Sequence, residues 1–152
     1  MSAAANRPFG IGADLCPVAR LAKALPRIGR RAFTPGELKA AQGRADAAEF
    51  LAGRWAAKEA ILKALGTGIA GVAPMNEIEI GTGSRGAPGV KLSAAAAKRV
   101  AALGAGAIHL SISHAGGFAL AFCWIERRDP SRAGRAGTAR RSAAPRRRPA
   151  RA

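Results

Sequence analysis

Residues 47–65 read AAEFLAGRWAAKEAILKAL, the stretch that most constrains the fold. Most of its residues are strong helix formers, and it contains no proline. Gly66 follows directly, at the position where glycine commonly ends a helix. The sequence therefore predicts a helix over 47–65, the longest in the chain.

Three shorter helices are predicted, two before this stretch and one after it. Pro17 can open a helix whose apolar residues have helical spacing, and we expect Pro26 to end it. Thr34 and Glu37 have the spacing of a capping box, so a second helix begins there. The third helix, over 93–103, ends before a glycine.

Strands are indicated by alternation of apolar with polar or glycine residues. In residues 9–15 this alternation places Asp14 on the face opposite the apolar side chains. Residues 115–117, Ala-Gly-Gly, join two alternating segments as a hairpin. The remaining strands are predicted over 77–80, 90–92, 108–113 and 118–125. The resulting order, β-α-α-α-β-β-α-β-β, is typical of an α+β fold.

The 152 residues suffice for one compact domain and a tail. Residues 127–152 contain ten arginines against Asp129, a net charge of +9, and no Phe, Trp, Leu, Ile, Val or Met. Such a segment buries too little surface to offset the entropy lost on ordering. We therefore predict a disordered arginine-rich tail over 127–152, after a domain of residues 1–126 that carries +7 of the total +16.

Composition also bears on assembly and location. Alanine accounts for 39 residues, so bulky apolar side chains are few, and a thin core favours association of subunits. No apolar run is long enough to span a membrane, and the first residues lack the apolar stretch of a signal peptide, which predicts a cytoplasmic protein. Cys16 and Cys123 form no metal cluster and no disulfide framework, so we expect reduced packing residues.

Acidic residues are scarce, nine in the chain, and two of them suggest chemistry. Asp14 and Glu59 can share a hard cation, because magnesium takes one or two protein carboxylates and fills its other positions with water and phosphate oxygens. Lys63 lies one helical turn after Glu59 on the same face. The alternatives are a surface ion pair between Glu59 and Lys63, and a turn or helix-cap role for Asp14. Sequence spacing alone does not bring the two carboxylates together.

Three segments carry a resemblance to a known family: GIGADLCPVAR over 10–20, FLAGRWAAKEAILKALGTGI over 50–69 and HLSISHAGGFALAF over 109–122. In this order and spacing they resemble the three motifs of the holo-acyl-carrier-protein synthases, the small bacterial 4′-phosphopantetheinyl transferases. The similarity spans roughly residues 9 to 126. It implies that family's fold, an antiparallel sheet packed with a long helix. It also implies a homotrimer whose active sites are shared between neighbouring subunits.

The resemblance implies an enzyme that transfers the phosphopantetheine arm of coenzyme A to a serine of apo acyl carrier protein and releases adenosine 3′,5′-bisphosphate. Asp14 and Glu59 match the family's magnesium ligands, with Mg²⁺ acting on the coenzyme A pyrophosphate. Lys63 matches its phosphate-contacting lysine and completes the predicted catalytic set. Glu59, directly or through a water on the metal, is one candidate to accept the serine proton. The identity of the base stays open at this point.

Further matches concern the coenzyme. His114 corresponds to a histidine that contacts the nucleotide in the family, while a structural role is the alternative on the sequence alone. Gly66 and Thr67 match the family's Gly-Thr-Gly at the end of the long helix. Gly86 and Pro88 resemble a Gly-x-Pro loop near the adenine. These residues, with Lys63, are the predicted coenzyme-binding set.

Carrier proteins are acidic, and the family docks them on basic residues after the first motif. Arg20 matches the docking arginine, and Arg27 continues the basic stretch together with Arg30 and Arg31. A solvated charged face is the alternative for these last three. Charges of this kind mainly raise the association rate and its sensitivity to salt.

The first motif departs from the family pattern, because Cys16-Pro17-Val18 follows Leu15 where a second acidic residue is usual. An inactive homologue that only binds the carrier protein is therefore one alternative function. Another is a nucleic-acid-binding protein that holds phosphate backbones nonspecifically through the basic tail. That alternative offers no reason for the matched acidic residues and lysine, and aromatic residues for base stacking are few.

Overall fold

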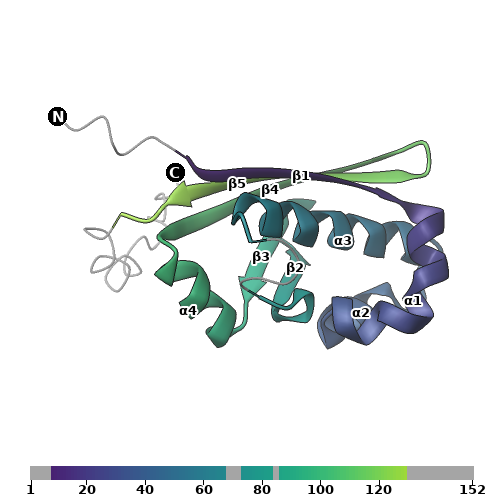
Figure 1. Ribbon diagram of the computed structural model, residues 1–152. Coiled ribbons are helices and arrows are strands. Elements are labelled where there is room, and N and C mark those ends of the chain that lie inside the picture. Colours follow the sequence, from purple (N-terminus) through teal and green to yellow (C-terminus); the bar gives the residue numbers. More distant parts are fainter. Residues whose placement is uncertain (1–7, 68–72, 84–85, 130–152) are drawn as a thin grey trace, which may run out of the picture.

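The computed structural model describes residues 8–67, 73–83 and 86–129 (Figure 1). The helices are α1 (Val18–Ala32), α2 (Pro35–Ala41), α3 (Ala47–Ala64) and α4 (Ala94–Ala102), with a short 3₁₀ helix, η2 (Met75–Glu77). The strands are β1 (Pro8–Pro17), β2 (Ile78–Thr82), β3 (Pro88–Leu92), β4 (Ala105–Ala115) and β5 (Phe118–Arg127). The predicted order of helices and strands is confirmed, and so is the α+β class.

Helix α3, predicted from 47–65, is the centre of the core. It contacts β1 and β5 on one side and α1, α2 and β2 on others. Alanines at 52, 56, 57 and 60 of this helix are fully buried. A helix enclosed on several sides needs small side chains so that its neighbours can approach closely, which explains why the alanine-rich stretch lies at the centre.

The strands form two antiparallel sheets. One has three strands in the order β1-β5-β4, and the other consists of β2 and β3. In the larger sheet, Ala121 of β5 lies beside Asp14 of β1 on one side and Ile112 of β4 on the other. Strands β1 and β4 are therefore the two edges of this sheet.

The two faces of the larger sheet differ in what covers them. Helix α3 packs on the face with the smaller residues, where Ala119, Ala121, Cys123 and Ile125 of β5 are fully buried. Figure 1 shows no helix or strand of the described chain over the opposite face. The large apolar side chains on that face, between 43% and 58% exposed, are Ile11, Leu15, Phe118, Leu120 and Phe122. The alternation in the sequence separates the two faces correctly but does not say which one α3 covers.

Glycines in β1 allow this strand to lie directly on α3. A Cβ atom on Gly12 would overlap the carbonyl oxygen of Ala60, and one on Gly10 would overlap the carbonyl oxygen of Ala64. The neighbouring atoms belong to the helix backbone and cannot move aside. The glycines of the GIGAD segment thus fix the distance between strand and helix just before Asp14.

The prediction that Pro26 ends the first helix is wrong, because α1 continues through it to Ala32. The apolar stripe of α1, with Leu21 and Ala32 buried and Ile28 packed against the core, extends past the proline. Proline removes one backbone N–H, and the acceptor that loses it is the carbonyl of Ala22, an exposed residue where water can bond instead. Tertiary packing therefore outweighs the cost of the proline.

Other local predictions are confirmed. Thr34 and Glu37 form a complete capping box at α2, and Gly66 follows α3 with a φ of 73°, a conformation that favours glycine. Cys16 and Cys123 are buried free thiols, and burial raises the pKa of Cys123 to about 12. The last strand passes the predicted domain boundary at Glu126 and reaches Arg127. Residues 130–152 of the predicted tail lie outside the described part of the chain. No helix within the described part is long and apolar enough to cross a membrane.

Candidate active site

Asp14, Glu59 and Lys63 come together although 45 residues separate the first two in sequence. Asp14 lies in β1 on the face that packs against α3, two residues after Gly12. Glu59 and Lys63 lie one turn apart on α3, so they share a face of that helix. The close packing of β1 on α3 therefore brings the strand carboxylate to the two helix side chains.

The contacts at this site are direct. The ammonium of Lys63 donates to Asp14 Oδ1 over 2.7 Å and to the carbonyl oxygen of Ala13 over 3.0 Å. The Lys63 side chain is 50% exposed and that of Asp14 is 17% exposed. Glu59 is 9% exposed. The site thus combines two carboxylates and one ammonium at the border between the core and solvent.

Electrostatics at Glu59 follow from this arrangement. Burial and, second, the negative charge of Asp14 raise the pKa of Glu59, while the Lys63 ammonium opposes the shift. Two close carboxylates repel each other unless a cation lies nearby. The site therefore favours an added cation or a proton.

The structure decides between the alternatives that the sequence left open. Lys63 makes its ion pair with Asp14 on another element, and not with Glu59 on its own helix. Asp14 lies within β1 and caps no helix, since Pro17 is the N-cap residue of α1. The first amide of α1, that of Val18, donates instead to the carbonyl oxygen of Gly117 over 2.9 Å. The surface ion pair within α3 and the cap role of Asp14 are both excluded.

Gly66 and Thr67 follow α3 directly, at the end of the helix that carries Lys63. The amide of Thr67 donates to the carbonyl oxygen of Leu62 over 3.3 Å. Its hydroxyl oxygen is buried and has no hydrogen-bond partner within the part of the chain that the structure describes. Buried polar atoms are rarely left unpaired, so this hydroxyl has hydrogen-bonding capacity that the described residues do not use.

The other predicted coenzyme residues lie on β4 and at the start of β3. His114, on β4, packs against Gly53, where an added Cβ would lie 2.7 Å from its Nε2 atom. Gly53 precedes Glu59 by six residues, a rise of about 9 Å along a helix. His114 and Asp14 also lie on opposite edge strands of the sheet. The structure therefore does not bring His114 to the Asp14 site within one subunit.

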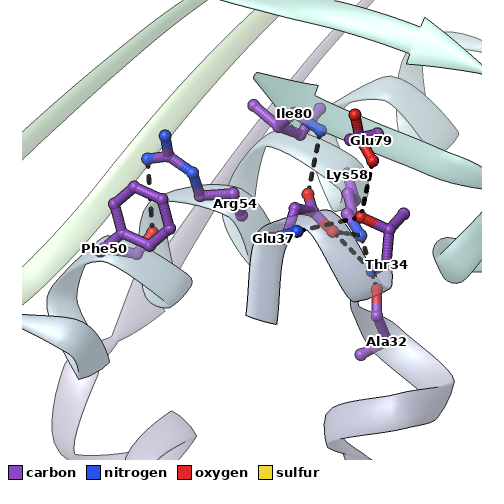
Figure 2. Close-up of polar contacts among 8 residues, drawn as sticks. All are labelled: Ala32, Thr34, Glu37, Phe50, Arg54, Lys58, Glu79 and Ile80. Carbon is purple, nitrogen blue, oxygen red and sulfur yellow. Dashed lines mark hydrogen bonds and ion pairs between the residues drawn. The ribbon is translucent and has the colours of Figure 1, made fainter. Parts of the chain in front are cut away.

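The loop with Gly86 and Pro88 belongs to the same side as His114. Pro88 pairs with Thr82 across the β2–β3 hairpin, and the Thr82 hydroxyl accepts a hydrogen bond from Arg54 over 3.1 Å. Figure 2 shows the Arg54 guanidinium lying over the ring of Phe50, 3.5 Å from its centroid. Arg54 Nε is the second buried side-chain atom that lacks a partner among the described residues. Sequence reasoning missed Arg54, although it stands within the second matched motif.

The predicted docking residues form one stripe on α1. Arg20 and Arg27 are exposed, as are Arg30 and Arg31. With Lys23, which sequence reasoning missed, all five basic residues fall within about a third of the helix circumference, opposite the buried Leu21. The helical spacing of residues 20, 23 and 27 was the signal for this lysine.

Comparison with known proteins identifies the family of this chain. A model of the 4′-phosphopantetheinyl transferase superfamily matches residues 10–123. The chain belongs to this superfamily. Its resemblance to the holo-acyl-carrier-protein synthases is therefore confirmed, and with it the prediction of a phosphopantetheinyl transferase enzyme.

Individual members support the assignment over most of the chain. A holo-acyl-carrier-protein synthase of Koribacter versatilis is 37% identical over 122 residues, which cover 78% of this chain and 98% of the relative. The crystal structure of the Neisseria meningitidis synthase has a TM-score of 0.74 and 33% identity, covering 80% of this chain and 100% of that one. The Bacillus anthracis synthase in complex with CoA (3′,5′-ADP) has a TM-score of 0.67 and 36% identity, covering 79% and 97%. The predicted fold family is confirmed.

Proposed function

We propose that this chain transfers the 4′-phosphopantetheine arm of coenzyme A to a serine of apo acyl carrier protein, with Mg²⁺, and releases adenosine 3′,5′-bisphosphate. The observation that carries the proposal is the 2.7 Å contact of Lys63 with Asp14 beside the buried Glu59. The coenzyme A bound to the Bacillus anthracis relative supports the choice of donor.

The residues present fit magnesium. Asp14 and Glu59 offer hard carboxylate oxygens. Burial and, second, the charge of Asp14 raise the pKa of Glu59, so a divalent cation would relieve a cost that the fold carries. Among the described residues no group of three or more His, Cys, Asp or Glu side chains forms a ligand set. Two carboxylates are what magnesium commonly takes from a protein, with water and substrate phosphates as its other ligands. When bound, the ion would neutralise charge on the pyrophosphate.

The reaction forms a bond between the serine oxygen and the phosphorus that carries the pantetheine arm, and it breaks the bond from that phosphorus to the bridging oxygen of the pyrophosphate. The half-exposed ammonium of Lys63 is suited to bind a phosphate oxygen on which negative charge accumulates. The serine proton needs an acceptor, and Glu59, directly or through a water on the metal, is the candidate that this site offers. The bridging oxygen leaves with adenosine 3′,5′-bisphosphate.

We further propose that coenzyme A binds between two copies of the chain in a homotrimer. One half of its site holds Asp14, Glu59, Lys63 and the unpartnered hydroxyl of Thr67, and the other half holds His114, the Gly86–Pro88 loop and Arg54. Each half contains one buried polar atom that has no partner among residues 8–67, 73–83 and 86–129, which supports a ligand at both. Because the halves lie on opposite edge strands of one subunit, we propose that the coenzyme uses both where two subunits meet.

The uncovered face of the β1-β5-β4 sheet supports this assembly. Five large apolar side chains there are about half exposed, and contiguous apolar surface of this kind marks an interface. This apolar surface extends over β1 and β5. On β4, the residues that face the same way include Ser111 and Ser113, which are small and polar. A second copy is the occupant that we propose, since it would supply the missing half-site.

The basic stripe on α1 supports the proposal that the partner is an acidic carrier protein. Its five cationic side chains are exposed on the helix that begins four residues after Asp14. A negatively charged helix of a carrier protein would complement this stripe, with most of the effect on association rate. The stripe therefore lies next to the site where the serine would react.

The test is intact-mass spectrometry of apo acyl carrier protein incubated with coenzyme A, Mg²⁺ and the full chain. We expect a gain of one phosphopantetheine arm, lost with Glu59→Gln and retained with Glu49→Gln, a matched change at an exposed position on the same helix. A version ending at Asp129 keeps the amide of Arg128 that donates to Gly104, and it shows whether the remaining tail is needed. Absence of the mass gain with folded protein and several acidic carrier proteins would overturn the proposal.

A further inference from the structure

Lys58 precedes Glu59 on α3 and, unlike it, is completely buried. Its ammonium donates to Glu37 Oε2 and to the carbonyl oxygen of Ala32, each over 2.6 Å (Figure 2). It also lies 5.1 Å from the ring centroid of Phe33. Because no part of it reaches solvent, Lys58 cannot touch a substrate, so its function is to hold other parts of the protein.

The carboxylate of Glu37 is occupied on both oxygens. Oε1 accepts from the amide of Ile80 in β2 over 2.9 Å, and Oε2 accepts from the amide of Thr34 over 2.8 Å besides the Lys58 ammonium. The Thr34 hydroxyl in turn donates to Glu79 over 2.9 Å. The pair therefore joins α3, the start of α2 and the free edge of β2 through directional bonds.

Stability alone is a weak reason for such a pair. Desolvation of two charges offsets most of their attraction, and replacement of a buried pair by apolar groups is often neutral or stabilising. Hydrogen bonds, in contrast with apolar contacts, fix the rotation and the axial position of the elements that they join. A buried, fully bonded pair therefore fits a positioning role better than a stabilising one.

The element positioned in relation to α3 is α1. Ala32, whose carbonyl oxygen Lys58 holds, is the last residue of α1, and the first residue of α1 follows β1 directly. The helix with the basic stripe is thus tied at one end to the strand of Asp14 and at the other to the helix of Glu59. Without the second tie, only the apolar packing of residues such as Leu21 and Ile28 would hold α1 on the core, and such contacts allow small shifts.

We propose that the Lys58–Glu37 pair is a positioning device that sets the basic face of α1 relative to the Asp14–Glu59–Lys63 site, and so determines how the carrier protein is presented to it. This inference rests on the proposed function. Neither residue is catalytic, since neither reaches the reacting atoms. The device acts on the protein substrate, because α1 carries the basic stripe and none of the predicted coenzyme-binding residues.

The test uses the full chain with Lys58→Met and Glu37→Gln combined, which removes both charges with little change of volume. We expect the KM for carrier protein to rise about tenfold or more, since a misplacement of ~1 Å can cost up to ~10²-fold. The KM for coenzyme A and kcat should stay within about twofold. Amide hydrogen exchange is a second readout, and it does not depend on activity. Compared with the parent chain, the double variant should exchange faster in residues 18–41, whereas exchange in β5 should stay the same.

Val100→Ala is the matched control, because this buried residue is destabilising to truncate and lies on α4, whose main contacts are with β3 and β4. It should lower the melting temperature without changing either KM. The proposal would be overturned if the control raised the KM for carrier protein as much as the double variant does. It would also be overturned if the double variant kept the parent's KM for carrier protein and the parent's exchange rates in α1. Glu37→Gln alone is a milder variant that gives the same readouts if the double variant fails to fold. If the parent chain transfers nothing, the proposed function fails, whereas the exchange rates still decide whether the pair anchors α1.

Discussion

Replacement of Gly12 by alanine tests the contact on which the site depends. The added Cβ would overlap the carbonyl oxygen of Ala60 and crowd the amide of Ala64, both parts of the α3 backbone. The strand must therefore move away from the helix and take Asp14 with it. Overpacking of this kind costs about 1–3 kcal/mol, which corresponds to a fall in Tm of roughly 2–12 °C at ~2–4 °C per kcal/mol.

The same substitution should lower phosphopantetheine transfer by about 10²-fold, since a displacement of ~1 Å at a reacting geometry has an effect of that size. Gly81→Ala is the control, because a Cβ there meets open space and its φ is not positive. It should keep full activity and the same or a slightly higher Tm. Differential scanning fluorimetry and the mass-spectrometric rate assay measure both. A Gly12→Ala variant with the Tm and rate of the parent would refute the close packing of β1 on α3.

Three further outcomes are expected. Lys63→Ala should lower the transfer rate by about 10²–10³ with little change in Tm, because the side chain is half exposed; an unchanged rate would contradict its role. Phe122→Asp should yield monomers in sedimentation velocity and abolish transfer, whereas Leu103→Asp, at a similarly exposed site on another surface, should do neither. The pKa of Glu59 is higher in the folded chain than in the unfolded chain, so between these two pKa values the folded chain holds a proton that the unfolded chain has released. The free energy of unfolding therefore falls as the pH rises through this range. Glu59→Gln in metal-free buffer should therefore melt higher than the parent at pH 7 and equally below about pH 4.

The order of elements could be predicted because each depends on nearby residues. The capping box at Thr34 and Glu37 acts over three residues, and the helix end at Gly66 over one turn. Pro26 shows where such reasoning fails, since packing of Ile28 and Ala32 on the core keeps α1 intact beyond it. Local signals are reliable where local energies dominate and fail where burial of a distant surface is larger.

The candidate site was only partly accessible from the sequence. Motif resemblance selected Asp14, Glu59 and Lys63, and the chain packs them together. The same resemblance placed His114 in the set without indicating that it packs against Gly53, which precedes Glu59 by about 9 Å along α3 in the same subunit. Lys58 and Arg54 were missed because a charged residue in a helix gives no sign of its burial until its neighbours are known.

By itself, the sequence determined the types and order of the elements, the family and the chemical groups available for catalysis. Spacing within a few residues and the resemblance of three short motifs to those of a known family are sufficient for these. Only the tertiary structure decided that Lys63 pairs with Asp14, that the larger apolar residues of β1 and β5 face away from α3, and that the coenzyme residues divide into two groups. The physical reason is that these features depend on contacts between segments some 45 residues or more apart, and such contacts form through the packing of whole elements.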